Sequence, residues 1–275
     1  MNKLNSGKRK AVVSALVEGV SVNATARLTG VAKTTILRLL RELGTACARY
    51  HDLQVRGLKP ETVQTDELWA FIGAKEKNVR PGHEADGWGS SWTWTAITDR
   101  KLIIAYRVGL RTQADADAFM LDLAGRVNNR TQLTSDGHST YLDAVTNAFG
   151  FDVDYAQLVK SYSGPNAERS SEAKYSPPAI CMATKVPVIG LPRRDRISTS
   201  HVERHNLTIR MGMRRFTRLT NAHSKKFENH AHAAAIFFQF YNFARIHGTL
   251  GTSPAVASGL ADHVWTLDEF IGLLD

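Results

Sequence analysis

The sequence has few cysteines and no long apolar run, and both features narrow the range of functions. Its only cysteines, Cys47 and Cys181, are far apart and form no CxxC pair, so neither a disulfide framework nor a zinc module is indicated. No stretch approaches the roughly 18 apolar residues that a membrane-spanning helix requires. The short apolar run at 11–17 follows three basic residues but lacks a convincing signal-peptide cleavage site. A reducing, cytoplasmic location without membrane attachment is therefore expected.

Positive charge is abundant and concentrated in two blocks. The 275 residues include 35 Lys and Arg against 26 Asp and Glu, which gives a net charge of +9 and a pI near 9.7. Residues 1–44 hold eight Lys or Arg against two Glu, and residues 185–226 hold eleven against one Asp and one Glu. The rest of the chain is therefore net negative. Two basic blocks favour a polyanionic partner, which would place the protein on the nucleoid.

The first block, residues 1–44, predicts three short helices. Apolar residues recur at helical spacing from Lys8, Ser21 begins a second helix that Gly30 ends, and a third helix is expected at 32–43. A short helix, a turn with glycine and a helix with a polar, basic face resemble a helix-turn-helix DNA-binding domain. The side chains expected in the major groove are Lys33, Thr34, Thr35 and Arg38. The alternative is a small helical bundle with a solvated basic face.

The segment at 63–73, VQTDELWAFIG, predicts the most buried strand, after a linker expected at 45–62. Asp66 and Glu67 lie on opposite faces of this strand because side chains alternate along it, and both faces are otherwise apolar. An uncompensated carboxylate there would cost roughly several kcal/mol. A metal ion is one compensator, and a strand cap or an arginine partner for Asp66 is the alternative.

The elements after this strand predict a familiar order. Strands are expected at 92–98 and 101–108, a helix at 112–127, a strand at 131–135, a helix at 141–149 and a strand at 152–158. The order β-β-β-α-β-α-β is that of the ribonuclease-H-like fold, an α/β class with a mixed sheet flanked by helices. Its first and fourth strands are neighbours, so Asp66 and Asp136 are expected within a few ångströms, where Mg²⁺ or Mn²⁺ would offset their repulsion. Taken alone, Asp136 is equally a turn residue.

The third candidate acid is Glu203, in a helix expected from 197 to about 215. Helical geometry puts Arg210 and Arg214 within about 20° of the direction of Glu203. Asn206 lies on the same side. This polar stripe indicates either an ion-pair ladder on a solvated face or a metal ligand beside phosphate-binding arginines. Weaker rivals for the third acid are Glu168, Glu172 and Asp195.

Several motifs together resemble one family. TDELW, TSDGHSTYLDAV and STSHVERHNLTIRMGMRRFTRLTNAHSKKFENH, followed by YNFARIHGTLGTSPA, resemble the transposases of the bacterial insertion-sequence-one family, within the Asp-Asp-Glu transposase and integrase superfamily. The resemblance implies a catalytic core at 63–256, and a C-terminal tail helix is expected at 257–275. It also implies a catalytic, metal-binding triad of Asp66, Asp136 and Glu203. The chain lacks the cysteine-rich module that some relatives carry.

The implied function is DNA transposition, by metal-dependent cleavage and strand transfer at the ends of an insertion sequence. Two Mg²⁺ or Mn²⁺ ions are the expected cofactors. Double-stranded DNA is the expected partner, as terminal repeats and as target, and pairing of two ends predicts at least a homodimer. The expected phosphate contacts are Arg210, Arg214, Arg215, Arg218, Lys225 and Lys226. Two alternatives stay open: a catalytically silent DNA-binding regulator, and a structure-specific nuclease without strand transfer.

Overall fold

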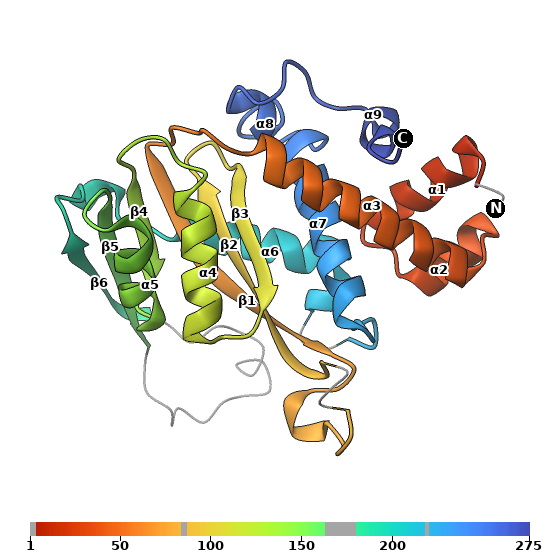
Figure 1. Cartoon of the computed structure of the whole chain (residues 1–275), viewed down its shortest axis with the longest axis horizontal. Helices are drawn as coiled ribbons and strands as arrows, with labels where there is room; N and C mark the ends of the chain where they lie inside the picture. The colour runs from red at the N-terminus through yellow and green to blue at the C-terminus, as the bar shows by residue number, and fades with distance from the viewer. Residues whose placement is uncertain (1–3, 84–86, 163–179, 218–219) are drawn as a thin grey trace.

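A six-stranded mixed sheet forms the centre of the computed structural model, which describes residues 4–83, 87–162, 180–217 and 220–275 (Figure 1). The strand order is β3-β2-β1-β4-β5-β6. β1, β2 and β3 are antiparallel neighbours, β4 and β5 run parallel to β1, and β6 is antiparallel to β5. The strands are β1 (Thr62–Ile72), β2 (Gly89–Thr98), β3 (Ile103–Gly109), β4 (Gln132–Asp136), β5 (Asp154–Tyr162) and β6 (Ile180–Ile189).

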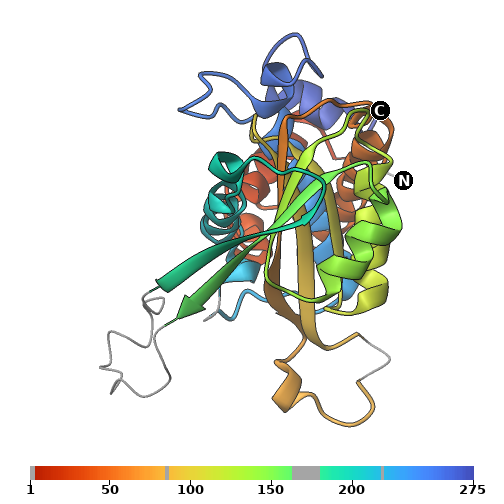
Figure 2. The ribbon, with the colours of Figure 1, turned by 90° about the vertical axis from the view of Figure 1, so that its left-hand side faces the viewer.

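The first five strands confirm the predicted ribonuclease-H-like α/β fold. Parallel strands need crossover connections, and the crossovers are α4 (Gln113–Ala124) and α5 (Thr140–Phe149), which cover one face of the sheet (Figure 2). The hairpin between β2 and β3 closes at the predicted turn, where the Thr98 amide donates to the Leu102 carbonyl at 2.9 Å. The sheet topology was therefore readable from the order of the elements.

The sequence does not predict β6. The strand lies at the edge of the sheet, and its side chains from Met182 to Val188 are exposed. A strand without a buried face has no alternation of apolar and polar residues for a sequence to display. The ladder with β5 is long, from Tyr155 opposite Ile189 to Tyr162 opposite Ile180.

Helices from both ends of the chain cover the other face of the sheet. α3 continues to Gln54, so residues 45–54 of the expected linker are helical instead. Its buried side continues through Cys47 and His51. These residue types make the helical spacing of apolar residues harder to recognise in the sequence. The helices on this side and the short elements are α1 (Ser6–Val17), α2 (Val22–Thr29), α3 (Lys33–Gln54), α6 (Ser200–Gly212), α7 (Phe227–Phe243), α8 (Pro254–Ala257), α9 (Leu267–Gly272) and the 3-10 turns Glu76–Asn78, Arg194–Arg196 and Arg214–Phe216.

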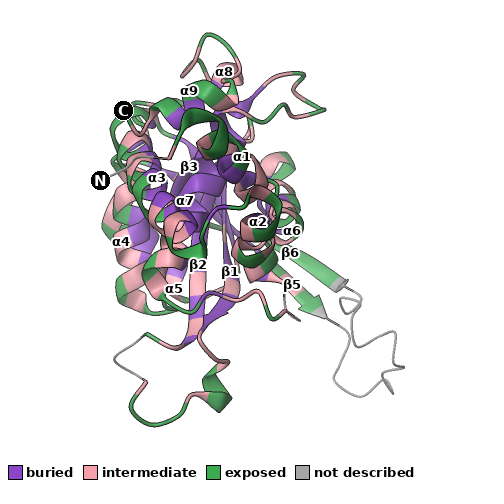
Figure 3. Cartoon of the chain, turned by 90° about the vertical axis from the view of Figure 1, so that its right-hand side faces the viewer, coloured by how far each residue is buried: buried purple, intermediate pink, exposed green. Residues whose placement is uncertain are grey.

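One hydrophobic core joins the N-terminal helices to the sheet and to the C-terminus (Figure 3). It includes Val12 of α1, Leu40 of α3, Phe238 of α7 and Phe270 of α9. The predicted boundary at residue 44 therefore does not separate two cores. Among the described residues, no helix combines the length and the apolar character needed to cross a bilayer.

The YNFARIH motif has a structural role at the edge of the sheet. Asn242 is fully buried, and its side chain accepts from the Ile103 amide and donates to the Ile103 carbonyl, both at 2.9 Å. Because β3 is an edge strand, these bonds satisfy backbone groups that no further strand pairs. Pro254 is buried at the start of α8.

Candidate metal centre

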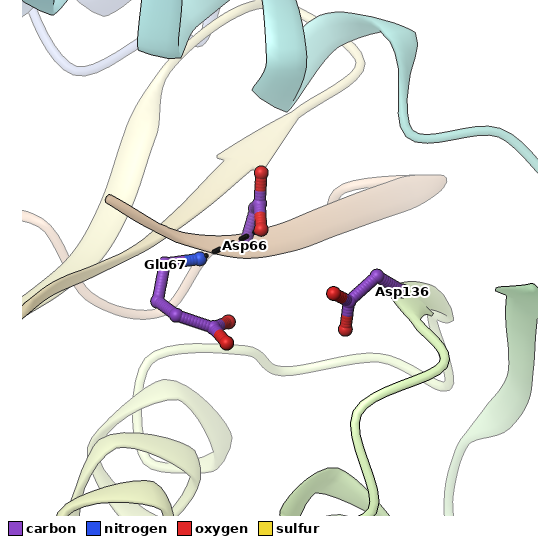
Figure 4. A group of neighbouring side chains, drawn as sticks. All are labelled: Asp66, Glu67 and Asp136. Atoms are coloured by element: carbon purple, nitrogen blue, oxygen red, sulfur yellow. Dashed lines mark hydrogen bonds between the residues drawn. The ribbon is translucent and has the colours of Figure 1, made fainter. Parts of the chain in front are cut away.

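Three acidic side chains meet where β4 ends beside the middle of β1 (Figure 4). β1 and β4 are in parallel register, with Gln64 opposite Thr134, so Asp66 and Asp136 lie level on neighbouring strands. One carboxylate oxygen each from Asp66, Glu67 and Asp136 lie within 4.8 Å of one another. The prediction that Asp66 and Asp136 approach within a few ångströms is confirmed. Within the described ranges, no other group of three His, Cys, Asp or Glu is this compact.

Asp66 is held by neutral donors and repelled by acids. Its Oδ1 accepts from the Glu67 amide at 2.9 Å, and its Oδ2 accepts from Nδ2 of Asn206 on α6 at 2.7 Å. Burial, together with the negative charges of Glu67 and Asp136, raises the pKa of Asp66 to about 7. A bound cation would reverse this cost, because it favours the ionised carboxylate that burial disfavours.

Glu67 belongs to the cluster although it leaves β1 on the opposite face from Asp66 (Figure 4). Its Oε1 accepts from Nε of Arg111 at 2.6 Å, and its Oε2 accepts from the Tyr141 hydroxyl at 2.9 Å. Only 1% of the Glu67 side chain is exposed. Glu67 is therefore a fixed, arginine-compensated carboxylate at the rim of the cluster. Sequence reasoning did not predict its participation; its only signal was the adjacent acid pair in a buried strand.

Asp136 ends β4 in a tight turn. Its Oδ1 accepts from the His138 amide at 3.0 Å, which fixes the carboxylate at the start of the following loop. A Cβ at Gly137 would lie 3.1 Å from Cγ2 of Val159, so glycine permits the close approach of this turn to β5.

Glu203 lies outside the three-acid cluster. Its Oε1 accepts from the Thr199 hydroxyl at 2.6 Å and forms an ion pair with Lys160 of β5. Its side chain is 47% exposed, yet its charge still helps to raise the pKa of Asp66. The structure thus joins two members of the predicted triad, and the role of Glu203 stays a prediction.

The rival third acids are no better placed. Asp195 is exposed and pairs with Arg193 at 2.9 Å. Glu168 and Glu172 lie outside the described residues.

α6 is fastened to β1 at its first turn. Oε1 of Gln64 accepts from the amides of His201 and Val202 at 2.7 and 3.2 Å, so a β1 side chain caps the helix. This contact directs Asn206 toward Asp66. The predicted stripe is shorter than expected, because α6 ends at Gly212 and Arg214 lies in the following 3-10 turn.

α6 ends where it packs closely against α7. A Cβ at Gly212 would lie 2.7 Å from a ring carbon of Phe237, and Met213 is already extended. Arg210 stays on the α6 side of this break, where Nη1 donates to the Phe216 carbonyl at 3.1 Å. The polar stripe predicted from helical spacing therefore extends only from Glu203 to Arg210.

The other predicted DNA contacts divide by exposure. Arg214, Lys225 and Lys226 are exposed, whereas Arg215 donates to the Ser224 hydroxyl at 2.8 Å and to the Asn229 carbonyl at 3.0 Å. Arg215 is thus engaged inside the protein, and its role as a DNA contact is not supported by its position. Arg218 lies outside the described residues.

Two of the N-terminal helices lie where the sequence predicts a second and a third helix, and their role as a DNA-binding motif stays a prediction. α2 and α3 are joined by a three-residue turn, in which Gly30 has a φ of 66°. Lys33 and Thr34 are exposed, and Thr35 and Arg38 are partly exposed, at the start of α3. Figure 1 shows α2 at the opposite end of the molecule from β5 and β6.

Comparisons with known proteins give distant similarities only. No protein-family model matches the chain, and no curated protein matches it. The chain is similar to a piggyBac transposase synaptic complex with hairpin DNA, at 12% identity over 99% of this chain and 71% of that chain, with a TM-score of 0.41. It is also similar to a Mos1 transposase paired-end complex with the left transposon end, at 13% identity over 56% of this chain, with a TM-score of 0.24. That match spans 60% of the Mos1 chain, less than two thirds of its length.

Proposed function

We propose that the protein is a DNA transposase of the Asp-Asp-Glu type, which cleaves and joins phosphodiester bonds with divalent cations bound at Asp66 and Asp136. The observation that carries the proposal is the meeting of Asp66, Glu67 and Asp136 at the end of β4, where the pKa of Asp66 is raised. The sequence motifs that resemble insertion-sequence-one transposases support the finer assignment.

The donor set fits Mg²⁺ or Mn²⁺. Both ions prefer hard oxygen ligands, and the cluster offers carboxylates whose mutual repulsion a cation would relieve. Cations bound there would stabilise the negative charge that develops on phosphate oxygens during an in-line displacement. Asp66 and Asp136 would hold the cations, and Glu67 would keep its place through Arg111 and Tyr141.

Glu203 would complete the triad by exchanging its partners. Its present contacts are Thr199, which precedes α6, and Lys160, which lies near the carboxyl end of β5. If Glu203 turned toward cations held by Asp66 and Asp136, Lys160 would be free to pair with a DNA phosphate. Arg214, Lys225 and Lys226 are exposed and would add phosphate contacts.

The N-terminal helices would bind the terminal repeats. Lys33, Thr34, Thr35 and Arg38 begin α3, the position from which a recognition helix contacts bases in the major groove. Binding of two ends at once would require a homodimer or a larger assembly. This division separates recognition by α3 from chemistry at β1 and β4.

The test is cleavage and joining of DNA by the full chain. The substrate is a duplex taken from the DNA that flanks the reading frame, incubated with Mg²⁺ or Mn²⁺ and a second target duplex. The parent should nick the duplex and join its 3′ end to the target. Asp66→Asn and Asp136→Asn should do neither. Asp152→Asn should act like the parent, because Asp152 is an exposed residue just before β5.

The outcomes separate the alternatives. Binding without cleavage by the parent would indicate a regulator, and cleavage without joining would indicate a nuclease that does not transfer strands. Cleavage by Asp66→Asn at the parental rate would show that the metal centre is assigned to the wrong residues.

A further inference from the structure

β1 and β2 continue beyond the acid cluster as a two-stranded ribbon that projects from the body of the molecule (Figure 2). One face of this ribbon carries a row of rings. Trp69 of β1 lies directly opposite Trp92 of β2. The ring centres of Trp69 and Phe71 are 5.8 Å apart, and those of Phe71 and His223 are 4.6 Å apart. We call these four residues the aromatic ribbon.

A backbone contact holds the last ring of the row in place. The amide of Gly73 donates to the carbonyl of Ser224 at 2.8 Å, and Ile72 and Ser224 form a parallel bridge. The segment before α7 therefore adds to the edge of β1, and His223 lies beside Phe71 for that reason. The row is built from three segments that are distant in sequence.

The aromatic ribbon lies on the same face of the sheet as Glu67. Trp69 and Phe71 follow Glu67 at intervals of two residues, which keeps all three on one side of β1. Arg111 gives independent confirmation, because it bonds Glu67 and also lies over Trp92, with 4.8 Å from its guanidinium carbon to the ring centre. The row of rings therefore begins at the rim of the acid cluster and leads away from it.

Exposure distinguishes the two tryptophans of the aromatic ribbon from core packing. Trp94, two residues further into the body on β2, is fully buried between Phe119 and Tyr141. Trp69 and Trp92 are partly exposed, whereas Phe71 is only 5% exposed and packs beside Trp69. Large aromatic faces that stay accessible next to a candidate active site are available to a ligand.

Positive charge accompanies the rings. Nζ of Lys75 lies 6.0 Å from the ring centre of Phe71, and Nζ of Lys225 lies 2.5 Å from Nε2 of His223. A groove of about 680 Å³ runs beside Phe71 and His223, and its described lining includes Lys75 and Lys77 and no acidic residue. The aromatic ribbon therefore suits a ligand that combines flat rings with negative charge.

We propose that the aromatic ribbon binds unpaired nucleotides of a DNA strand whose phosphodiester lies at the acid cluster. The bases would stack on Trp69 and Trp92, and Lys75 and Lys77 would contact the phosphates. Stacking of this kind is tolerant of sequence, because every base presents an aromatic face. The inference rests on the proposed function and deepens it: the substrate carries a short single-stranded segment next to the bond that reacts.

The test compares two DNA ligands by fluorescence anisotropy. One is the blunt terminal-repeat duplex, and the other is the same duplex with a short single-stranded 3′ overhang. The parent should bind the overhang duplex about tenfold more tightly. In Trp69→Leu this ratio should fall to about one, and Trp69→Phe should restore most of it because a phenyl ring still stacks. Phe151→Leu, which changes an 87% exposed ring far from the ribbon, should keep the parental ratio.

Each outcome decides between the two proposals. Equal binding of both duplexes by the parent, or a parental ratio in Trp69→Leu, would overturn the aromatic ribbon and leave the proposed function standing. Failure of the parent to bind either duplex would overturn both. Because Trp69 also donates to Ser90 at 3.2 Å, Lys77→Ala provides a second variant at an exposed site, and it should reduce the ratio about twofold.

Discussion

The acid cluster and an ion network between α3 and α4 concentrate charge in opposite ways. In the network, Arg126 pairs with Asp52 at 3.0 Å and with Asp122 at 2.8 Å, while Arg56 adds a second cation beside both acids. A hydrogen bond from Arg56 lowers the pKa of Asp52. In the acid cluster, by contrast, burial and neighbouring acids raise the pKa of Asp66 to about 7.

The difference separates charges that stabilise the fold from charges that await a ligand. The network is neutralised within the chain, and Arg126 also donates to the carbonyls of His51 at 3.3 Å and Val55 at 3.0 Å. It therefore ties the end of α3 to the end of α4. The acid cluster has an arginine only at Glu67, so the carboxylates of Asp66 and Asp136 face each other with neutral donors.

The largest expected effect separates the two regions by activity. Asp66→Asn should reduce DNA cleavage by at least about a thousandfold, because it removes a charged cation ligand. Asp52→Asn should leave the cleavage rate within about twofold of the parent, because Asp52 pairs with Arg126 and is not part of the acid cluster. The measurement is the initial rate of nicking at saturating Mg²⁺. Similar losses in both variants would remove the distinction.

The second effect is the pH dependence of stability without divalent cations. The folded-state pKa of Asp66 is raised, so its contribution to stability is fully present below about pH 4 and is lost as the pH rises to about 7. The free energy of unfolding of the parent, relative to Asp66→Asn, should fall by about 3 kcal/mol over this interval. Asp52 should act in the opposite direction, since its pKa is lowered and its contribution is lost as the pH falls.

Urea unfolding at several pH values, with a chelator present, measures this difference. Addition of Mn²⁺ at neutral pH should restore the stability of the parent and have no effect on Asp66→Asn. A flat difference between parent and variant from acidic to neutral pH would mean that Asp66 ionises normally.

The third effect tests the network as a structural device. Arg126→Met should lower the free energy of unfolding by about 3 kcal/mol, because it leaves two backbone carbonyls and an acid without their donor. Asp52→Asn should cost less than about 1 kcal/mol, since the Asp52 side chain is 57% exposed. Chemical denaturation measures both. Equal costs would show that Arg126 stabilises the fold through the exposed ion pair alone.

The smallest effect concerns the packing of α3 against α7, because the ion network depends on the position of α3. A Cβ at Gly44 would lie 2.4 Å from Cβ of His232 on α7, so Gly44→Ala should cost about 2 kcal/mol. Gly7→Ala is the matched helical control, because the nearest atom to its added Cβ is 3.9 Å away, and it should be neutral or slightly stabilising. Thermal unfolding of the two variants gives the comparison, and a Gly44→Ala protein as stable as the control would contradict this packing.

The sequence predicted what depends on pattern and order. Alternating apolar residues and the spacing of turns gave β1 to β5 with both crossover helices, and that order places β1 beside β4. The closeness of Asp66 and Asp136 follows from the topology alone. Asn206 was placed on the correct side of α6 by helical geometry, and the structure shows its bond to Asp66.

What the sequence did not predict depends on side-chain conformation and on distant partners. Glu67 joins the cluster because Arg111 and Tyr141 fix its rotamer, and neither is near it in sequence. The pairing of Glu203 with Lys160 depends on how α6 crosses the end of β5. β6 escaped prediction because an exposed edge strand has no buried face to show.

Calorimetric titration with Mn²⁺ at neutral pH tests the central claim most directly. The account predicts that the parent and Asp52→Asn bind Mn²⁺ and release protons on binding, because the cation ionises Asp66, whereas Asp66→Asn shows no such binding. Equal binding by all three proteins, or no binding by the parent, would contradict it.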